Sequence, residues 1–234
     1  MYFDFHLRSN KNIKEVLTES KRLGYYGVAV IQPSDIFDYN LIKDLSEIQS
    51  NLNLKLYNGV EITAKNGNDL KKKISRFRNK VDVLLVRGGK IKINRAACED
   101  PRVDIVTYTH YKRRDCGLNH VIAKEAARNE VAVEINLNSI LKARYSSRAK
   151  LLSQYRDILK LYRKYRFPLI ISSGATSIFD LRKPLDIISL NQCFGITKDE
   201  SIKGMSITPS NIIKRNEKRQ DLVVAGVRNL GFID

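Results

Sequence analysis

Short apolar runs bounded by turn residues recur along the chain, and runs of this length are typical of strands buried on both faces. Between them, apolar residues repeat at intervals of three and four, as on one face of a helix. The alternation predicts seven strands separated by helices. The predicted strands span residues 2–6, 26–31, 55–62, 81–86, 104–107, 131–135 and 168–172.

The clearest helix is predicted over residues 150–165, where apolar side chains form one stripe and basic side chains cover much of the rest. After residue 172 the strand signal fades. Thr197 and Glu200 have the spacing of a capping box, and Thr208 followed by Pro209 is typical of a helix N-terminus. We therefore expect the C-terminal third to be mainly helical.

The order of these elements narrows the fold class. Strands that alternate with helices predict a parallel sheet, and 234 residues suit either a closed β/α barrel or an open doubly wound sheet. The first strand is not followed by a G-x-G-x-x-G sequence, which disfavours the dinucleotide-binding type of open sheet. We predict one α/β domain over residues 1–234, a TIM-like β/α barrel of seven parallel strands with surrounding helices.

Charge adds a function class to this picture. The formal net charge is +17, far beyond the magnitude of about 2–8 that suits a small soluble domain. Such an excess indicates a polyanionic partner. More than half of it lies between residues 81 and 166, in groups that follow predicted strands or open predicted helices. Loops in these places commonly carry function.

The sequence also bears on the cellular compartment of the protein. No apolar run approaches the ~20 residues that cross a bilayer, and the first residues lack the basic start and apolar stretch of a signal peptide. We expect a cytoplasmic protein with no membrane partner.

Polar side chains fall at the carboxyl ends of the predicted strands, where β/α barrels place their working groups. Asp4, His6, Glu61 and His110 are the candidates for a metal site, because oxygen and nitrogen ligands of this kind suit Zn, Mn or Fe. The alternative is structural: Asp4 and Glu61 would pair with Arg87 or a histidine inside the barrel mouth, where charges must be matched.

The first strand makes a sharper prediction. A period of two places Asp4 and His6 on one side of this strand and Phe3 and Phe5 on the other. We expect both polar side chains to face the mouth.

At these positions the sequence resembles the ribonuclease P protein component 3 family, the barrel-forming subunit of archaeal ribonuclease P. The likeness covers nearly the whole chain, and the order and spacing of its motifs make it specific. The motifs are FDFH at 3–6, LGYYGVAV at 23–30, NGVEI at 58–62, VLLVRGG at 83–89, NRAACEDPRVDIV at 94–106, GLNHVIAKEAARN at 117–129, EINL at 134–137 and ISSGATS at 171–177.

The resemblance implies a fold similar to that of polymerase-and-histidinol-phosphatase-type metal phosphoesterases. Those enzymes open with His-x-His and close with Asp-x-His, whereas this sequence has Asp4-x-His6 and Gly174-x-Thr176. Several metal ligands are therefore missing. The resemblance implies no catalytic residue in the isolated chain and, at most, a vestigial metal site from Asp4, His6, Glu61 and His110.

The resemblance further implies a protein subunit of ribonuclease P, which removes the 5′ leader of precursor tRNA. The RNA subunit would carry the catalytic Mg²⁺, and this chain would hold no cofactor of its own. Its implied partners are the ribonuclease P RNA, protein component 2, other ribonuclease P proteins and, through the holoenzyme, precursor tRNA.

The basic groups at element ends are the predicted contacts to RNA phosphates. They are Arg87, Lys90, Lys92, Arg95, Lys112, Arg113, Arg114, Arg144, Arg148, Arg182 and Lys183. Tyr108, Tyr111 and Tyr145 lie beside these groups and are candidates to stack on unpaired bases or to pack structurally.

Two other functions stay open at this point. One is a metal-dependent phosphoesterase that uses the Asp4, His6, Glu61 and His110 mouth. The other is a scaffold whose positive charge matches an acidic protein subunit.

Overall fold

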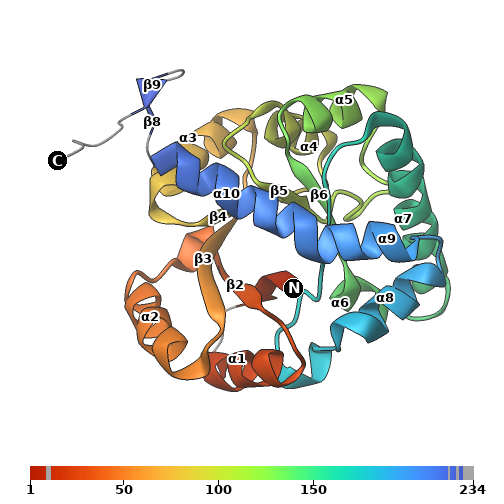
Figure 1. Cartoon of the computed structure of the whole chain (residues 1–234). Coiled ribbons are helices and arrows are strands. Elements are labelled where there is room, and N and C mark those ends of the chain that lie inside the picture. The colour runs from red at the N-terminus through yellow and green to blue at the C-terminus, as the bar shows by residue number, and fades with distance from the viewer. Residues whose placement is uncertain (9–11, 221, 225–226, 229–234) are drawn as a thin grey trace.

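The computed structural model describes residues 1–8, 12–220, 222–224 and 227–228. Seven parallel strands follow one another around the sheet in chain order (Figure 1). All seven predicted strands are confirmed, with no end more than two residues from its predicted position. They are β1 (Phe3–Arg8), β2 (Gly27–Pro33), β3 (Lys55–Ile62), β4 (Val83–Arg87), β5 (Ile105–Thr107), β6 (Ala132–Asn136) and β7 (Leu169–Ser172).

The sheet curls until its first and last strands meet, which gives a nearly closed barrel. In place of a regular ladder between β1 and β7, two hydrogen bonds from the described residues join this seam. The amide of Arg8 donates to the carbonyl of Ala175 at 2.9 Å, and the amide of Ser173 donates to Oδ1 of Asp4 at 3.1 Å. The fold class predicted from the alternating pattern is therefore confirmed.

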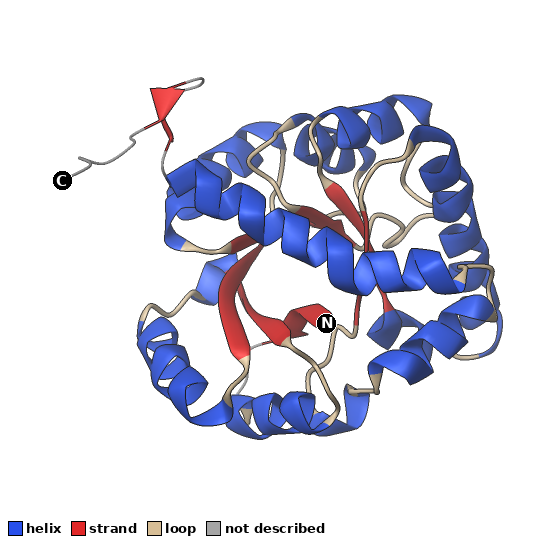
Figure 2. Cartoon of the chain, viewed as in Figure 1, coloured by secondary structure: helices blue, strands red, loops and turns tan. Residues whose placement is uncertain are grey.

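Helices surround the strands (Figure 2). They are α1 (Ile13–Arg22), α2 (Asn40–Leu52), α3 (Gly67–Phe77), α4 (Ile91–Glu99), α5 (His120–Arg128), α6 (Leu137–Lys142), α7 (Tyr145–Tyr165), α8 (Pro184–Gln192), α9 (Lys198–Ile202) and α10 (Thr208–Gln220). Short turns of helix are η1 (Ser34–Ile36), η2 (Arg78–Lys80), η3 (Ile178–Asp180) and η4 (Lys203–Ile207). Among the described helices, none is both long and apolar enough to cross a membrane.

The C-terminal third is mainly helical, as predicted, and a short antiparallel pair follows it, β8 (Leu222–Val224) with β9 (Val227–Arg228). The capping box is confirmed at Thr197 and Glu200. Thr208 is not an extended N-cap, because its φ of −60° and ψ of −49° are helical and α10 continues directly from η4. The wide π turn of η4 comes just before Pro209, whose nitrogen cannot donate a helical hydrogen bond.

Two apolar clusters build the core. The outer cluster joins the outward side chains of the strands, such as Val28 and Val30, to the surrounding helices. The inner cluster fills the barrel with Phe3, Phe5, Ala29, Ile31, Val83, Leu85, Ile105, Ala132, Ile170, Ile212 and Ile213. Alternate residues of one strand therefore serve different clusters, which explains why these strands are apolar on both faces.

The prediction for the first strand is wrong in one respect. Phe3 and Phe5 both belong to the inner cluster, so the side of the strand that was to face away from the mouth faces into the barrel. The pairing of β1 with β2 shifts by one residue between Asp4 and Leu7, as in a β-bulge. This extra residue breaks the period of two, so Asp4 and His6 do not share one side.

Helix α10 covers the end of the barrel at which the strands begin (Figure 1). Ile212 and Ile213 enter the inner cluster from this helix. Its polar side chains reach the strand starts, where Nη2 of Arg215 lies 3.0 Å from Oδ1 of Asp104. Nη1 of Arg78 lies 2.5 Å from the other oxygen of Asp104, which is fully buried. At the opposite end of the barrel, where the strands finish, side chains from other elements line the barrel.

Candidate functional site

A polar layer lies above the apolar interior, at the carboxyl ends of the strands. Residue pairing along the sheet explains it: Glu61 aligns with Leu85, and Glu134 aligns with Ile170, two apolar residues of the inner cluster. Two residues beyond Leu85 on β4, Arg87 aligns with Thr107. On β4, β5, β6 and β7, an apolar side chain of the inner cluster is thus followed two residues later by a polar one nearer the mouth.

Glu61 is the centre of one half of this layer. Its Oε2 accepts hydrogen bonds from Nη2 of Arg8 at 3.1 Å and from Nη1 of Arg87 at 3.5 Å. Its Oε1 accepts one from the Thr107 hydroxyl at 3.0 Å. The structural alternative is thereby confirmed for Glu61, which pairs with Arg87 and with a second arginine as well.

Glu134 is the centre of the other half. Its Oε1 lies 2.6 Å from Nδ1 of His6 and accepts hydrogen bonds from the Ser172 hydroxyl and from Nδ2 of Asn136. Burial opposes charge on His6, but the adjacent Glu134 carboxylate outweighs it and raises the pKa of His6. Burial likewise opposes charge on Glu134, whereas His6 and the two hydrogen bonds lower the pKa of Glu134. Both shifts favour the charged forms of the two side chains in the barrel interior.

Asp4 lies at the seam between β1 and β7. Its Oδ1 accepts hydrogen bonds from the amides of His6 at 3.2 Å and Ser173 at 3.1 Å. Burial raises the pKa of Asp4 in spite of these bonds. Its role is to bridge the seam.

His110 lies in the loop after β5. Its ring packs edge-on against Tyr155, with ring centroids 5.2 Å apart. Burial lowers the pKa of His110 to about 4, so this imidazole is neutral at physiological pH.

These donors do not fit the metal site of a phosphoesterase. Within the described residues, no three His, Cys, Asp or Glu side chains converge as a metal ion would require. Glu61 is held by Arg8 and Arg87, whose positive charges oppose a cation there. Nδ1 of His6 is occupied by Glu134, whereas Nε2 of His6, Oε2 of Glu134 and Oδ2 of Asp4 are buried without a hydrogen-bond partner among the described residues.

A cavity of about 640 Å³ opens above this layer. Six of its lining side chains are basic, and none of the described residues that line it is acidic. The lining residues are Arg8, Arg87, Tyr108, His110, Tyr111, Lys112, Arg113, Asn138, Ser139, Lys142, Ala143, Ser147, Lys150, Leu151 and Gln154. We call this cavity the basic mouth.

The structure brings part of the predicted RNA-binding set to this place. Arg87, Lys112 and Arg113 line the basic mouth. Others are exposed on the elements around it, at the carboxyl ends of β4, β5 and β6: these are Lys90, Lys92, Arg95, Arg114, Arg144 and Arg148. Of these, Arg95 is paired with Glu99 of its own helix, at 2.7 Å. Contact of these residues with RNA stays a prediction.

Arg182 and Lys183 are not part of this group. Both are exposed, between η3 and α8. The carbonyl of Arg182 accepts a hydrogen bond from the Tyr25 hydroxyl at 3.0 Å. Tyr25 lies just before β2, so this segment reaches the end of the barrel at which strands begin.

The three tyrosines have different surroundings. Tyr108 packs beneath Arg87, whose guanidinium carbon is 4.5 Å from the ring centroid. The same guanidinium carbon lies 5.2 Å from the ring centroid of Tyr111, which is 44% exposed. Tyr145 is 91% exposed at the start of α7. Packing explains Tyr108, whereas Tyr145 offers a free ring.

Sequence reasoning missed Arg8. The signal was present, because Arg8 follows Asp4 and His6 at intervals of two. Its partner, Glu61, could not be identified without the register of β1 against the other strands.

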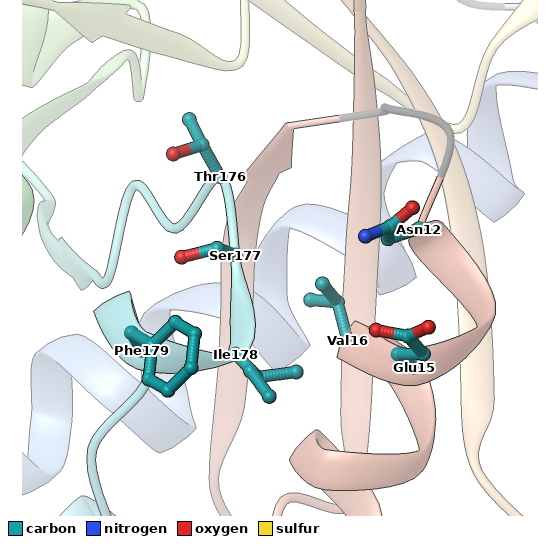
Figure 3. Close-up of a pocket in the computed structure, with 7 residues that line it drawn as sticks. All are labelled: Asn12, Glu15, Val16, Thr176, Ser177, Ile178 and Phe179. Atoms are coloured by element: carbon teal, nitrogen blue, oxygen red, sulfur yellow. The ribbon is translucent and has the colours of Figure 1, made fainter.

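A second cavity, of about 380 Å³, lies between α1 and the segment after β7 (Figure 3). Its lining residues are Asn12, Glu15, Val16, Thr176, Ser177, Ile178 and Phe179. Phe179 is 80% exposed. This cavity lacks the basic side chains of the mouth.

The comparisons with known proteins agree on one family. Residues 1–221 match the family described as RNase P subunit p30. The Ribonuclease P protein component 3 of Methanothermobacter thermautotrophicus is 42% identical over 234 residues, which cover 98% of this chain and 95% of that protein. A chain in the cryo-EM structure of archaeal Ribonuclease P with mature tRNA is 29% identical, with a TM-score of 0.86 over 99% of both chains.

A more distant likeness concerns the fold alone. The organophosphorus hydrolase from Deinococcus radiodurans matches with a TM-score of 0.56 at 11% identity, over 91% of this chain and 92% of the hydrolase.

Proposed function

This chain belongs to the RNase P subunit p30 family, and we propose that it binds the RNA of ribonuclease P through the basic mouth and the loops around it. It is a protein subunit of this tRNA-processing endoribonuclease, whose activity belongs to the holoenzyme. The observation that carries the RNA-binding proposal is the cavity lined by six basic side chains at one end of the barrel.

Electrostatics supply the mechanism. Folded RNA crowds its phosphates together, and lysine and arginine side chains can replace the counterions that the phosphates would otherwise need. The net charge of +17 gives the chain a strong field for this role. The chain then lowers the Mg²⁺ concentration at which the RNA subunit is active, while the catalytic Mg²⁺ stays on the RNA.

Partners and location form a finer part of the proposal. We propose that the chain acts together with ribonuclease P protein component 2 and other protein subunits, and that it meets precursor tRNA through the holoenzyme. Cytoplasmic location, expected from the sequence, stays a prediction.

The test is cleavage of precursor tRNA at low Mg²⁺ by the matching catalytic RNA and its other protein subunits, with this chain added or omitted. We expect addition to restore removal of the 5′ leader and the chain alone to be inactive. If addition has no effect across a range of Mg²⁺ concentrations, the proposed role is wrong.

The same preparation tests the phosphoesterase alternative. The pairing of Glu61 with two arginines and of His6 with Glu134 speaks against it. Hydrolysis of a simple phosphate ester by the purified chain, dependent on added Mn²⁺ or Zn²⁺ and lost in Glu61→Gln, would support the alternative instead.

A further inference from the structure

The charges around Glu61 do not balance. Arg8 and Arg87 share this one carboxylate, and their side chains are only 27% and 28% exposed. The neighbouring Glu134 carboxylate pairs with His6, and with His6 protonated this pair adds no net negative charge. Two half-buried guanidinium groups therefore face a single negative partner. A surplus positive charge in a half-buried place is costly unless an anion compensates it.

Tyr108 cannot compensate it. Its hydroxyl lies 3.4 Å from Nη2 of Arg8, but burial raises the pKa of Tyr108 to about 12, so the phenol is neutral. On the open side of the mouth the charge is positive again. Lys112 and Lys150 line the cavity, and neither has an acidic partner among the described residues.

Arg87 is held in the orientation that an anion would need. Its guanidinium lies over the rings of Tyr108 and Tyr111, at 4.5 Å and 5.2 Å from their centroids. Stacking limits the plane of the group, whose Nη1 lies 3.5 Å from Glu61 and whose other N–H donors have no acceptor among the described residues. The fork of N–H donors on an arginine matches the oxygen atoms of a phosphate group.

The loop that carries these groups is strained and firmly anchored. Tyr108 and Lys112 have φ angles of 49° and 56°, in the left-handed region that residues other than glycine seldom occupy. Such strain persists only where the surroundings enforce it, and it is common at binding sites. The enforcing contacts come from below the loop.

Two side-chain amides provide those contacts. Nδ2 of Asn94 donates to the carbonyls of Thr109 at 3.0 Å and Gly117 at 2.8 Å. Nε2 of Gln154 donates to the carbonyls of Arg113 at 3.0 Å and Asp115 at 2.9 Å. Both ends of the loop are thus tied to helices α4 and α7, and the cations it presents are preorganised.

From these observations we propose that the basic mouth is a binding site for one phosphate group of a nucleotide, held between Arg87, Arg8 and Lys112. A cavity of about 640 Å³ has the size of a small-ligand pocket, typically about 300–1,000 Å³. The proposal rests on the RNA-binding function and adds a discrete pocket to it. The phosphate can come from the RNA backbone or from a free nucleotide.

The test is isothermal titration calorimetry of the 234-residue chain. The ligands are inorganic phosphate, uridine 5′-monophosphate and a single-stranded RNA oligonucleotide. The variant is Arg87→Gln, and Lys160→Gln on the exposed surface of α7 is the control. We expect saturable binding that Arg87→Gln weakens at least about tenfold, as for loss of a charge-assisted, two-pronged contact. Lys160→Gln leaves it unchanged.

Stability provides an independent readout. Arg87→Gln leaves Arg8 and Glu61 as a balanced pair, so we expect no loss of stability in urea denaturation. Glu61→Gln does the opposite: it leaves two guanidinium groups without a carboxylate, so the protein loses stability while phosphate raises its melting temperature more than in the natural chain.

Each outcome decides the proposal. If phosphate competes with the oligonucleotide, the pocket binds the RNA backbone. If the monophosphate binds, and Arg87→Gln and the natural chain have equal affinity for the oligonucleotide, the pocket binds a free nucleotide. Absence of saturable binding for all three ligands, or equal binding of phosphate and of the monophosphate by Arg87→Gln and the natural chain, overturns it. A natural chain that supports precursor tRNA cleavage but shows either of these last two results refutes the pocket and leaves the RNase P function standing.

Discussion

The Nδ1 atom of His6 lies 2.6 Å from Oε1 of Glu134 in the polar layer above the apolar interior of the barrel. Both side chains are almost fully buried. The two groups are contributed by β1 and β6, which are far apart in the sequence and are brought together only when the barrel closes. This pair therefore forms only when the barrel is closed.

Replacement of one partner should be costly. We expect Glu134→Gln to lower the free energy of unfolding by about 3–5 kcal/mol near neutral pH, because it leaves His6 buried without its counter-charge. Urea denaturation measures this. The double variant His6→Gln with Glu134→Gln removes both charges and should be more stable than Glu134→Gln alone; equal stability would contradict an ion pair.

The same pair sets a pH window. The raised pKa of His6 means that its contribution is present below the unfolded value of about 6.5 and is lost as pH rises through the folded value. The lowered pKa of Glu134 means that its contribution is present above the unfolded value and is lost as pH falls through the folded one. Glu134→Gln should flatten both limbs of a stability profile against pH.

His110 predicts a separate effect in acid. Its folded pKa of about 4 lies below the unfolded value of about 6.5, so the unfolded chain binds the proton first. Stability should therefore fall as pH drops from about 6.5 towards 4, by roughly 2–3 kcal/mol from this group. His110→Gln should remove that slope in thermal melts taken across the range. A slope that survives the substitution would show that other groups cause it.

Asp104 holds the opposite end of the barrel together. Arg78, Arg215 and Arg219 all lie within 3.5 Å of its carboxylate, which is fully buried. We expect Asp104→Asn to cost about 3–5 kcal/mol, because it leaves these arginines without their shared anion. Asp157→Asn is the control: this surface residue pairs only with Lys160 among the described side chains, and its loss should change stability by less than about 1 kcal/mol.

The loop after β5 predicts the salt dependence of RNA binding. Replacing Lys112, Arg113 and Arg114 together by glutamine should weaken binding and reduce the slope of log affinity against log salt by about 2–3. A filter-binding titration at several salt concentrations measures both. The matched control replaces Lys124, Lys160 and Lys164, which are exposed on α5 and α7. An equal loss in the control would show that only total charge matters.

The strands of the sheet can be predicted from the sequence more accurately than the contacts between side chains can. All seven strands are recognisable because strands buried on both faces are continuous apolar runs, and β3 is predicted to the residue. The bulge in β1 is not recognisable, because no glycine or proline marks it and only the pairing with β2 reveals the extra residue. Alternation alone therefore put Phe3 and Phe5 on the wrong side.

Charged residues show the same limit. Arg87 was identifiable because it ends a strand, but its partners Glu61 and Tyr108 come from other strands and loops, at distances that local pattern does not encode. Helix α10 was expected, yet the entry of Ile212 and Ile213 into the barrel depends on where the last helix docks. Local chemistry indicates what a residue is able to do, and the closure of the sheet decides which residue it meets.

The position of α10 also constrains how the protein is made. A ribosome releases β1 first, but the interior that Phe3 and Phe5 help to fill is completed by Ile212 and Ile213, which are synthesised some two hundred residues later. Until then, the end of the barrel where its strands begin lies open to water. We therefore expect the apolar interior to stay incomplete until α10 has been synthesised, and the last step of folding to wait for this helix.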